Sequence, residues 1–184
     1  MNDKIVHVLA LLSAATVATV VGTYVHFDGS HWLGTVVMFT TIIHGNVSPN
    51  EVHLTVLGFS TGIMMESALW LIDPAITRLA LILTAAVFLS VMFATILFKS
   101  TFMLTMGSIL FYSLCGLLAW NLSVGTSYGE LYFGMVLFLL FVIFDTQVMM
   151  KGDNVIMCAI QLYLDAVNLF VRILSWLINH LRRR

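Results

Sequence analysis

Hydrophobic residues fall into seven long stretches that are separated by short polar turns. The stretches cover about 5–25, 30–46, 52–72, 75–98, 101–124, 130–150 and 155–179. Most approach the roughly 20 apolar residues that a helix needs to cross a bilayer. The turns contain glycine, lysine or aspartate, and Asp73-Pro74 makes an abrupt helix stop. The pattern predicts an all-α membrane protein, a seven-helix transmembrane bundle whose short connections favour antiparallel neighbours.

Two stretches leave the topology open. The second has an uninterrupted apolar core only from Trp32 to Ile43, so we expect it to be tilted or partly buried in protein. With a cytoplasmic N-terminus, the positive-inside rule places Lys4, Lys99 and Lys151 on the cytoplasmic side. A seventh full span would put the basic tail, 182–184, on the opposite side. Six spans plus a central or re-entrant C-terminal helix would keep it inside.

Composition supports the membrane assignment. Hydrophobic residues make up 60% of the 184 residues and charged residues 9%, and the mean hydropathy is +1.02, whereas soluble domains have about a quarter charged residues. We expect residues 1–184 to form one polytopic transmembrane domain with a short basic C-terminal tail, in contact with the lipid bilayer. A net charge of -1 without a basic patch elsewhere argues against a nucleic-acid partner. Cys115 and Cys158 lie in apolar surroundings, which predicts buried reduced thiols.

The last stretch carries a polar stripe at helical spacing. Its members follow one another at intervals of four, three, four, three and four residues: Gln161, Asp165, Asn168, Arg172, Ser175 and Asn179. Such a face avoids lipid, so it predicts contact with the bundle interior or with a hydrated cavity. The alternative is an amphipathic helix lying on the membrane surface, although such helices usually carry more basic residues.

Two aspartates interrupt the last two apolar stretches, Asp145 in LFVIFDTQ and Asp165 in QLYLDAVNLF. A carboxylate inside a span is costly and indicates a functional site. Counted from the intervening turn, they lie about 9 Å and about 16 Å deep, so they meet only if the last helix begins late or the turn dips inward. At about 4 Å they would repel by about 4 kcal/mol and share one proton. The alternative is that Asp145 caps the loop while Asp165 bridges to Arg172.

Other polar residues carry weaker signals. Glu66 shares a helix face with Gly58 and Gly62, so it points at neighbouring helices. It either belongs to an ion pathway or is held protonated by a neighbour such as Ser67. Three histidines at helix ends are interpreted as interfacial residues rather than metal ligands, because none has a second ligand at the i, i+4 spacing: His26, His31 and His44.

Short motifs resemble a known family. The segments IFDTQ (143–147) and QLYLDAVNLF (161–170) resemble the transmembrane Bax inhibitor motif family, and GTYVH (22–26) resembles its Bax inhibitor-1 branch. The resemblance implies a central last helix and a proton-sensitive latch, formed by Asp145 and Asp165, over a calcium path. It also implies calcium leak across the endoplasmic reticulum membrane in eukaryotic members, with suppression of cell death, and a plasma-membrane location in bacterial ones.

This chain departs from the family in three ways. The connection between the two motifs is shorter, and the N-terminal extension is almost absent. Some bacterial relatives bind the latch with an arginine on an early helix, but here no Lys or Arg occurs between Lys4 and Arg78. Arg172 is then the obvious substitute.

These features favour a pH-sensitive calcium leak channel that needs no cofactor and is not an enzyme. Asp145 and Asp165 would bind calcium transiently, with help from Gln161, Asn168 and Glu66, because calcium prefers oxygen ligands. One alternative is a non-conducting adaptor that binds apoptosis-regulating membrane proteins through its helices and basic tail. Another is an intramembrane aspartyl protease, which is disfavoured because GxGD and PAL motifs are missing. We expect the endoplasmic reticulum membrane for a eukaryotic or viral chain and the plasma membrane for a bacterial one.

Overall fold

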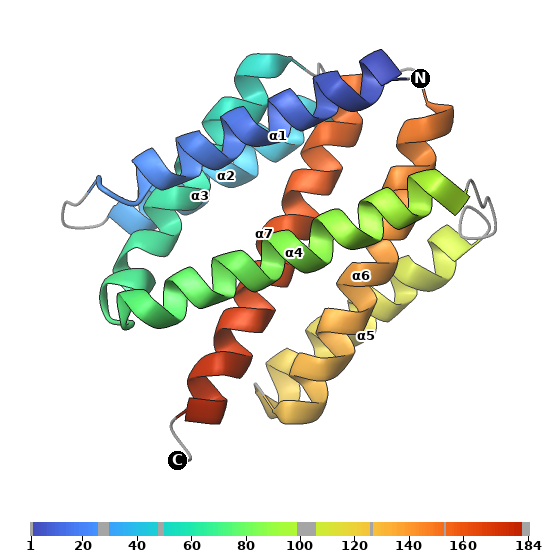
Figure 1. Cartoon of the computed structure of the whole chain (residues 1–184). Coiled ribbons are helices and arrows are strands. Elements are labelled where there is room, and N and C mark those ends of the chain that lie inside the picture. The colour runs from blue at the N-terminus through green and yellow to red at the C-terminus, as the bar shows by residue number, and fades with distance from the viewer. Residues whose placement is uncertain are drawn as a thin grey trace. The chain divides into compact units, whose positions relative to one another are not determined.

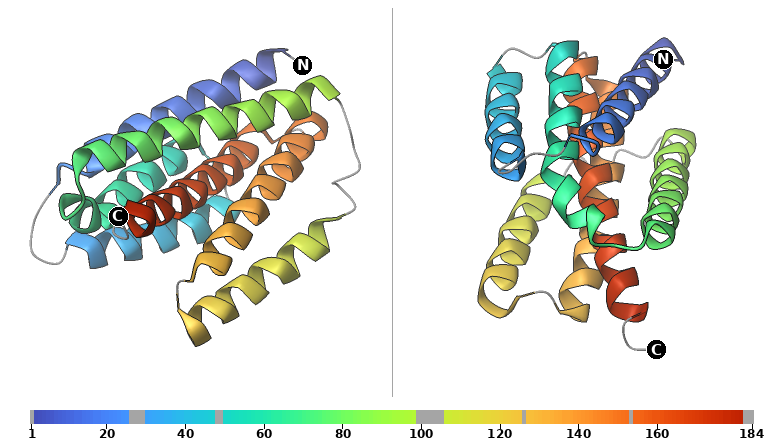
Figure 2. Two further views of the ribbon diagram at one scale, coloured as in Figure 1. Left: turned by 60° about the horizontal axis from the view of Figure 1, so that its bottom comes forward. Right: turned by 90° about the vertical axis from the view of Figure 1, so that its left-hand side faces the viewer.

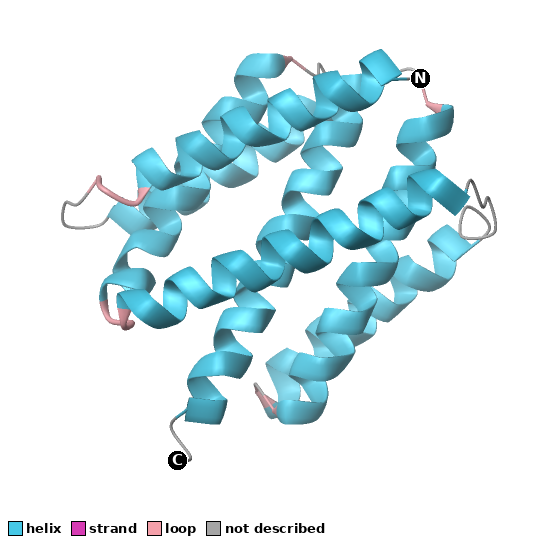
Figure 3. Cartoon of the chain, viewed as in Figure 1, coloured by secondary structure: helices cyan, strands magenta, loops and turns pink. Residues whose placement is uncertain are grey.

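The computed structural model describes residues 2–25, 30–47, 50–98, 106–125, 127–152 and 154–181. It is 93% helix with no strand over this part of the chain (Figures 1 and 3). The α-helices are α1 (Asn2–Gly22), α2 (Ser30–Val47), α3 (Glu51–Trp70), α4 (Pro74–Phe98), α5 (Gly107–Val124), α6 (Tyr128–Lys151) and α7 (Val155–Leu181). The all-α prediction is confirmed.

The number of helices that could cross a membrane differs from the prediction. Of the seven α-helices within the described residues, five are long and apolar enough to span a bilayer. These five are α1, α4, α5, α6 and α7. The difference arises at the second stretch, where the apolar segment Trp32–His44 is short, and at α3, which is not among the five. The tail at 182–184 lies outside the described residues, so its side of the membrane stays open.

The helices divide into two compact units, which are described separately. The first comprises Met1–Pro74 and Asp153–Tyr163. Within it, α3 packs against both α1 and α2 (Figure 1). A Cβ atom at Gly58 or Gly62 of α3 would collide with the backbone of Ala15 or Thr19 of α1. Small residues therefore let these two backbones approach, as expected of a GxxxG face inside a membrane.

A buried tyrosine joins the start of α7 to this first unit. The Tyr163 hydroxyl lies 2.7 Å from the Thr19 hydroxyl of α1 and is also hydrogen-bonded to Thr61 of α3. The three side chains thus place three helices around one polar cluster. In a membrane, such bonds between helices satisfy hydroxyls that lipid cannot.

The second unit comprises Ala75–Gly152 and Leu164–Arg184. Here α5 lies beside α6 (Figures 1 and 2), and a core cluster is formed by Leu110, Leu117, Leu137 and Phe138. Helix α6 begins after Ser127, whose side chain accepts a hydrogen bond from the Glu130 N–H, because the first N–H groups of a helix need such a partner. The prediction of one domain over 1–184 stays a prediction.

Two hydrogen bonds tie the start of α6 to the end of α7 within this second unit. The Tyr128 hydroxyl donates to the backbone carbonyl of Asn179 at 2.9 Å. The indole N–H of Trp176 donates to the Tyr132 hydroxyl at 3.0 Å. Both helices are therefore held at the level of Glu130, while the aspartates lie toward their other ends.

One thiol differs from expectation. Cys158 is buried, as predicted, whereas Cys115 is exposed on α5. The prediction for Cys115 is wrong because an apolar neighbourhood in a spanning helix is as compatible with a lipid-facing position as with a buried one.

Candidate ion site

Asp145 of α6 and Asp165 of α7 come together in the second unit. Both are buried, with 5% and 6% of their surfaces exposed, and their side chains lie close enough to interact. The connection is short, since α6 ends at Lys151 and α7 begins at Val155. The two helices nevertheless bring side chains from different depths to the same point.

A hydrogen bond between two carboxyl groups requires a proton. An ionised carboxylate only accepts hydrogen bonds, so one of the two groups must be protonated to donate. If both were ionised, like charges in a buried site would repel. A direct bond between these two side chains would therefore require at least one proton.

Some side-chain oxygens at or next to the two aspartates in sequence are buried without a partner in the described part of the chain. Asp165 Oδ2, Thr146 Oγ1 and Gln147 Oε1 are buried and have no hydrogen-bond partner among the described residues. Consecutive helical residues point about 100° apart, so the burial of Asp145, Thr146 and Gln147 shows that α6 is covered on several sides at this level. Buried oxygens without partners are uncommon and are the type of atom that binds hard cations. In the sequence, Thr146 and Gln147 stand out only as part of the IFDTQ motif (143–147).

The predicted supporting residues on α7 differ in their surroundings. Asp165 is buried, Gln161 and Arg172 are partly exposed, and Asn168 is exposed. The Asn168 amide donates to the Leu164 carbonyl of its own helix at 2.9 Å. The stripe therefore does not face the interior uniformly. Gln161 belongs to the part of α7 that falls in the first unit.

Arg172 pairs with a residue that sequence reasoning missed. Its guanidinium Nη1 donates to Glu130 Oε1 in a salt bridge, and Asn121 Nδ2 donates to the same oxygen at 3.3 Å. Asp165, the partner that the sequence offered as an alternative, lies seven residues earlier on α7, about 10 Å along the helix axis. The missed signal was the arginine itself, because a cation within a span requires an anionic partner.

Glu66 and the histidines lie in the first unit. Glu66 is buried on α3, consistent with the predicted inward face, while the Ser67 side chain lies outside the described part. His44 Nδ1 lies 2.7 Å from His53 Nε2 on the next helix. The described residues contain no group of three or more His, Cys, Asp or Glu that could hold a metal ion. His26 and the His31 side chain lie outside this description.

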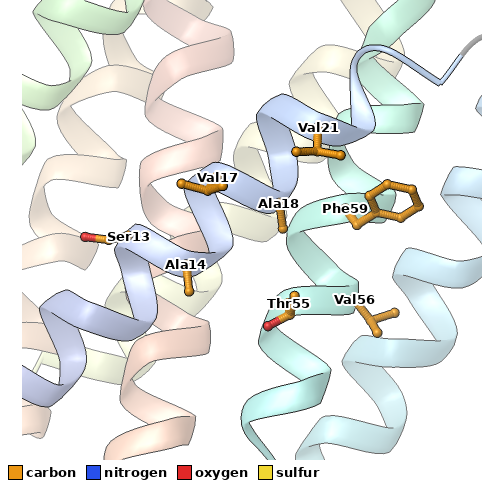
Figure 4. A pocket seen from close by; sticks show the side chains of 8 residues that line it. All are labelled: Ser13, Ala14, Val17, Ala18, Val21, Thr55, Val56 and Phe59. Atoms are coloured by element: carbon orange, nitrogen blue, oxygen red, sulfur yellow. The ribbon is translucent and has the colours of Figure 1, made fainter.

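A groove on the first unit is a poor candidate for an ion site. It has a volume of about 660 Å³ and runs between α1 and α3 (Figure 4). Its lining is almost wholly apolar: Ser13, Ala14, Val17, Ala18, Val21, Thr55, Val56 and Phe59. The carboxyl pair is therefore the better candidate for cation chemistry.

Comparison with known families agrees with the motifs. A family model described as inhibitor of apoptosis-promoting Bax1 matches residues 1–182. The chain belongs to the Bax inhibitor motif family. It is accordingly an integral membrane protein, as the five apolar helices among the described residues also indicate. No match to a curated protein was found for this member of the Bax inhibitor motif family.

Proposed function

We propose that this chain is a passive calcium leak channel in which Asp145 and Asp165 form a proton-sensitive latch. The observation that supports it best is the contact of two buried carboxyl groups between α6 and α7. Buried ionisable side chains in membrane helices usually mark ion or proton pathways. Membership of the Bax inhibitor motif family is consistent with this role.

Protons and calcium compete at the pair. With one proton shared, the carboxyl groups bond to each other and the pair carries a single negative charge. Loss of that proton leaves two carboxylates, which separate by repulsion and together attract a divalent cation. Asp165 Oδ2, which has no hydrogen-bond partner among the described residues, provides an oxygen of the kind that calcium prefers. Acidification therefore weakens the calcium site and reduces the flux.

Amide substitutions test the latch. In proteoliposomes, Asp145→Asn and Asp165→Asn are expected to lower calcium flux at neutral pH by about tenfold, equivalent to about 1.4 kcal/mol of lost cation binding. The midpoint of the pH response should move to lower pH, because the remaining carboxylate no longer lies beside a like charge.

The matched control is Asp73→Asn, an aspartate in the turn before α4. It should leave both flux and pH response unchanged. If Asp145→Asn and Asp165→Asn also conduct like the wild type at every pH, the proposal that these aspartates form a latch is wrong.

The family description favours a second function, restraint of a death-promoting membrane protein without conduction. In that case helices and tail would serve as a binding surface, and polybasic tails also attract anionic lipid. Deletion of residues 182–184 separates the two functions. Loss of protection from cell death with intact calcium flux would support the adaptor, whereas loss of protection in Asp165→Asn together with lost flux would support the channel.

A further inference from the structure

A second buried charge centre lies on the same two helices as the aspartate pair. It consists of Glu130 on α6 and Arg172 on α7, with Asn121 of α5 donating to the same carboxylate oxygen. The Glu130 side chain is 0% exposed and that of Arg172 16% exposed. Removing both charges from water is costly, so a pair within spanning helices indicates a role beyond packing.

The helix surface around this pair is shaped for the arginine. Gly134 lies one turn after Glu130 on α6, and a Cβ atom there would lie 2.9 Å from both Cζ and Nε of Arg172. That distance is shorter than real Cβ contacts, so a larger residue at 134 would force the end of the Arg172 side chain to shift. Arg172 thus binds the Glu130 carboxylate and crosses α6 at Gly134, where no side chain is in its way.

The pair occupies a different level from the aspartates. Glu130 precedes Asp145 by fifteen residues on α6, about 22 Å along the axis. Arg172 continues the polar face that begins at Asp165, with the exposed Asn168 between them. Glu130 Oε2 is buried and has no hydrogen-bond partner within the described chain. Arg172 is the next charged side chain on α7 after Asp165.

We infer that Arg172 is the selectivity barrier of the path and that Glu130 neutralises it. This inference rests on the proposed channel function. Neutralised by Glu130, the guanidinium permits a slow calcium leak. Without Glu130, an uncompensated positive charge would repel calcium and attract anions; without Arg172, a carboxylate with open oxygens would become an additional calcium site.

The charge variants should change flux in opposite directions. In proteoliposomes at fixed pH, Glu130→Gln is expected to lower calcium flux by about tenfold and to raise chloride permeability. Arg172→Gln should raise calcium flux several-fold, and the double variant should return to within about twofold of the wild type. The pH midpoint should stay near the wild-type value in Arg172→Gln, because both aspartates remain.

Two glycine variants test the same inference if a charge variant does not fold. Gly134→Ala retains both charges but displaces the guanidinium, so it should lower calcium flux as Glu130→Gln does. The control is Gly129→Ala on the same helix, where a Cβ atom would lie 3.7 Å from Trp120, an ordinary contact. It should leave flux unchanged.

The outcomes separate this inference from the channel proposal. If wild-type liposomes carry no calcium flux, both are overturned. If the wild type conducts but Glu130→Gln and Arg172→Gln change flux in the same direction with unaltered calcium-to-chloride selectivity, the pair is only structural and the selectivity barrier is wrong. Opposite changes with the double variant restored would support it.

Discussion

At the scale of single residues, the most informative feature of this protein is its set of buried carboxyl groups. Asp145 and Asp165 stand out in the sequence because a charge within an apolar stretch is rare. Their contact could not be predicted from the sequence, since it depends on how two helices of different depth cross after a short turn. Arg172 indicated that an anionic partner was needed, but the sequence could not single out Glu130, because a carboxylate at the start of a predicted span is also typical of a solvent-exposed helix end.

The Tyr163 hydroxyl gives a residue-level prediction. Tyr163→Phe removes its bonds to Thr19 and Thr61 and leaves their hydroxyls with fewer partners. We expect the free energy of unfolding in detergent to fall by about 1 kcal/mol, the usual net value of a buried hydrogen bond. Tyr112→Phe is the control, because that side chain is 73% exposed. Equal stability of both variants would contradict a role for this cluster.

Helix positions follow closely from the apolar stretches at the scale of elements. The predicted ranges 52–72, 75–98 and 130–150 correspond to α3, α4 and α6 within a few residues. The Gly58–Gly62 spacing also predicted a close helix contact. The sequence could not identify α1 as the partner, because small residues allow an approach by any neighbouring helix.

Equal substitutions at two glycines test that contact. Gly62→Ala would press a Cβ atom into the Thr19 carbonyl of α1, so we expect it to lower the free energy of unfolding by about 1–3 kcal/mol. Gly116→Ala on α5 meets nothing within 4 Å and should be neutral or slightly stabilising, since alanine favours helix. Thermal unfolding in detergent measures both. The close α1–α3 contact is wrong if Gly62→Ala is as stable as Gly116→Ala.

Composition alone establishes a helical membrane protein at the scale of the whole molecule. The number of spans was less predictable, because a stretch such as Trp32–His44 is too short to decide between crossing the bilayer and packing against protein. The sequence pattern likewise does not show which side chains of different helices contact one another. The match over residues 1–182 extends the resemblance of the short motifs to nearly the whole chain.

The two cysteines test how the molecule sits in lipid. Cys115 is exposed and Cys158 buried, while α5 and α7 both qualify as spans. In proteoliposomes, an apolar maleimide should label Cys115 much faster than Cys158, and a charged maleimide should label neither. Rapid labelling of Cys115 by the charged reagent would show that this face of α5 contacts water, and the membrane placement of α5 would have to be revised.

Calcium flux through purified protein in liposomes, measured across a pH series, tests the central claim most directly. We expect flux in the wild type that is highest at neutral to alkaline pH and falls on acidification, as the aspartates take up their shared proton. Asp165→Asn should weaken the flux and move its midpoint to lower pH. Wild-type liposomes that carry no more calcium than empty ones, or a flux that does not depend on pH, would contradict the account.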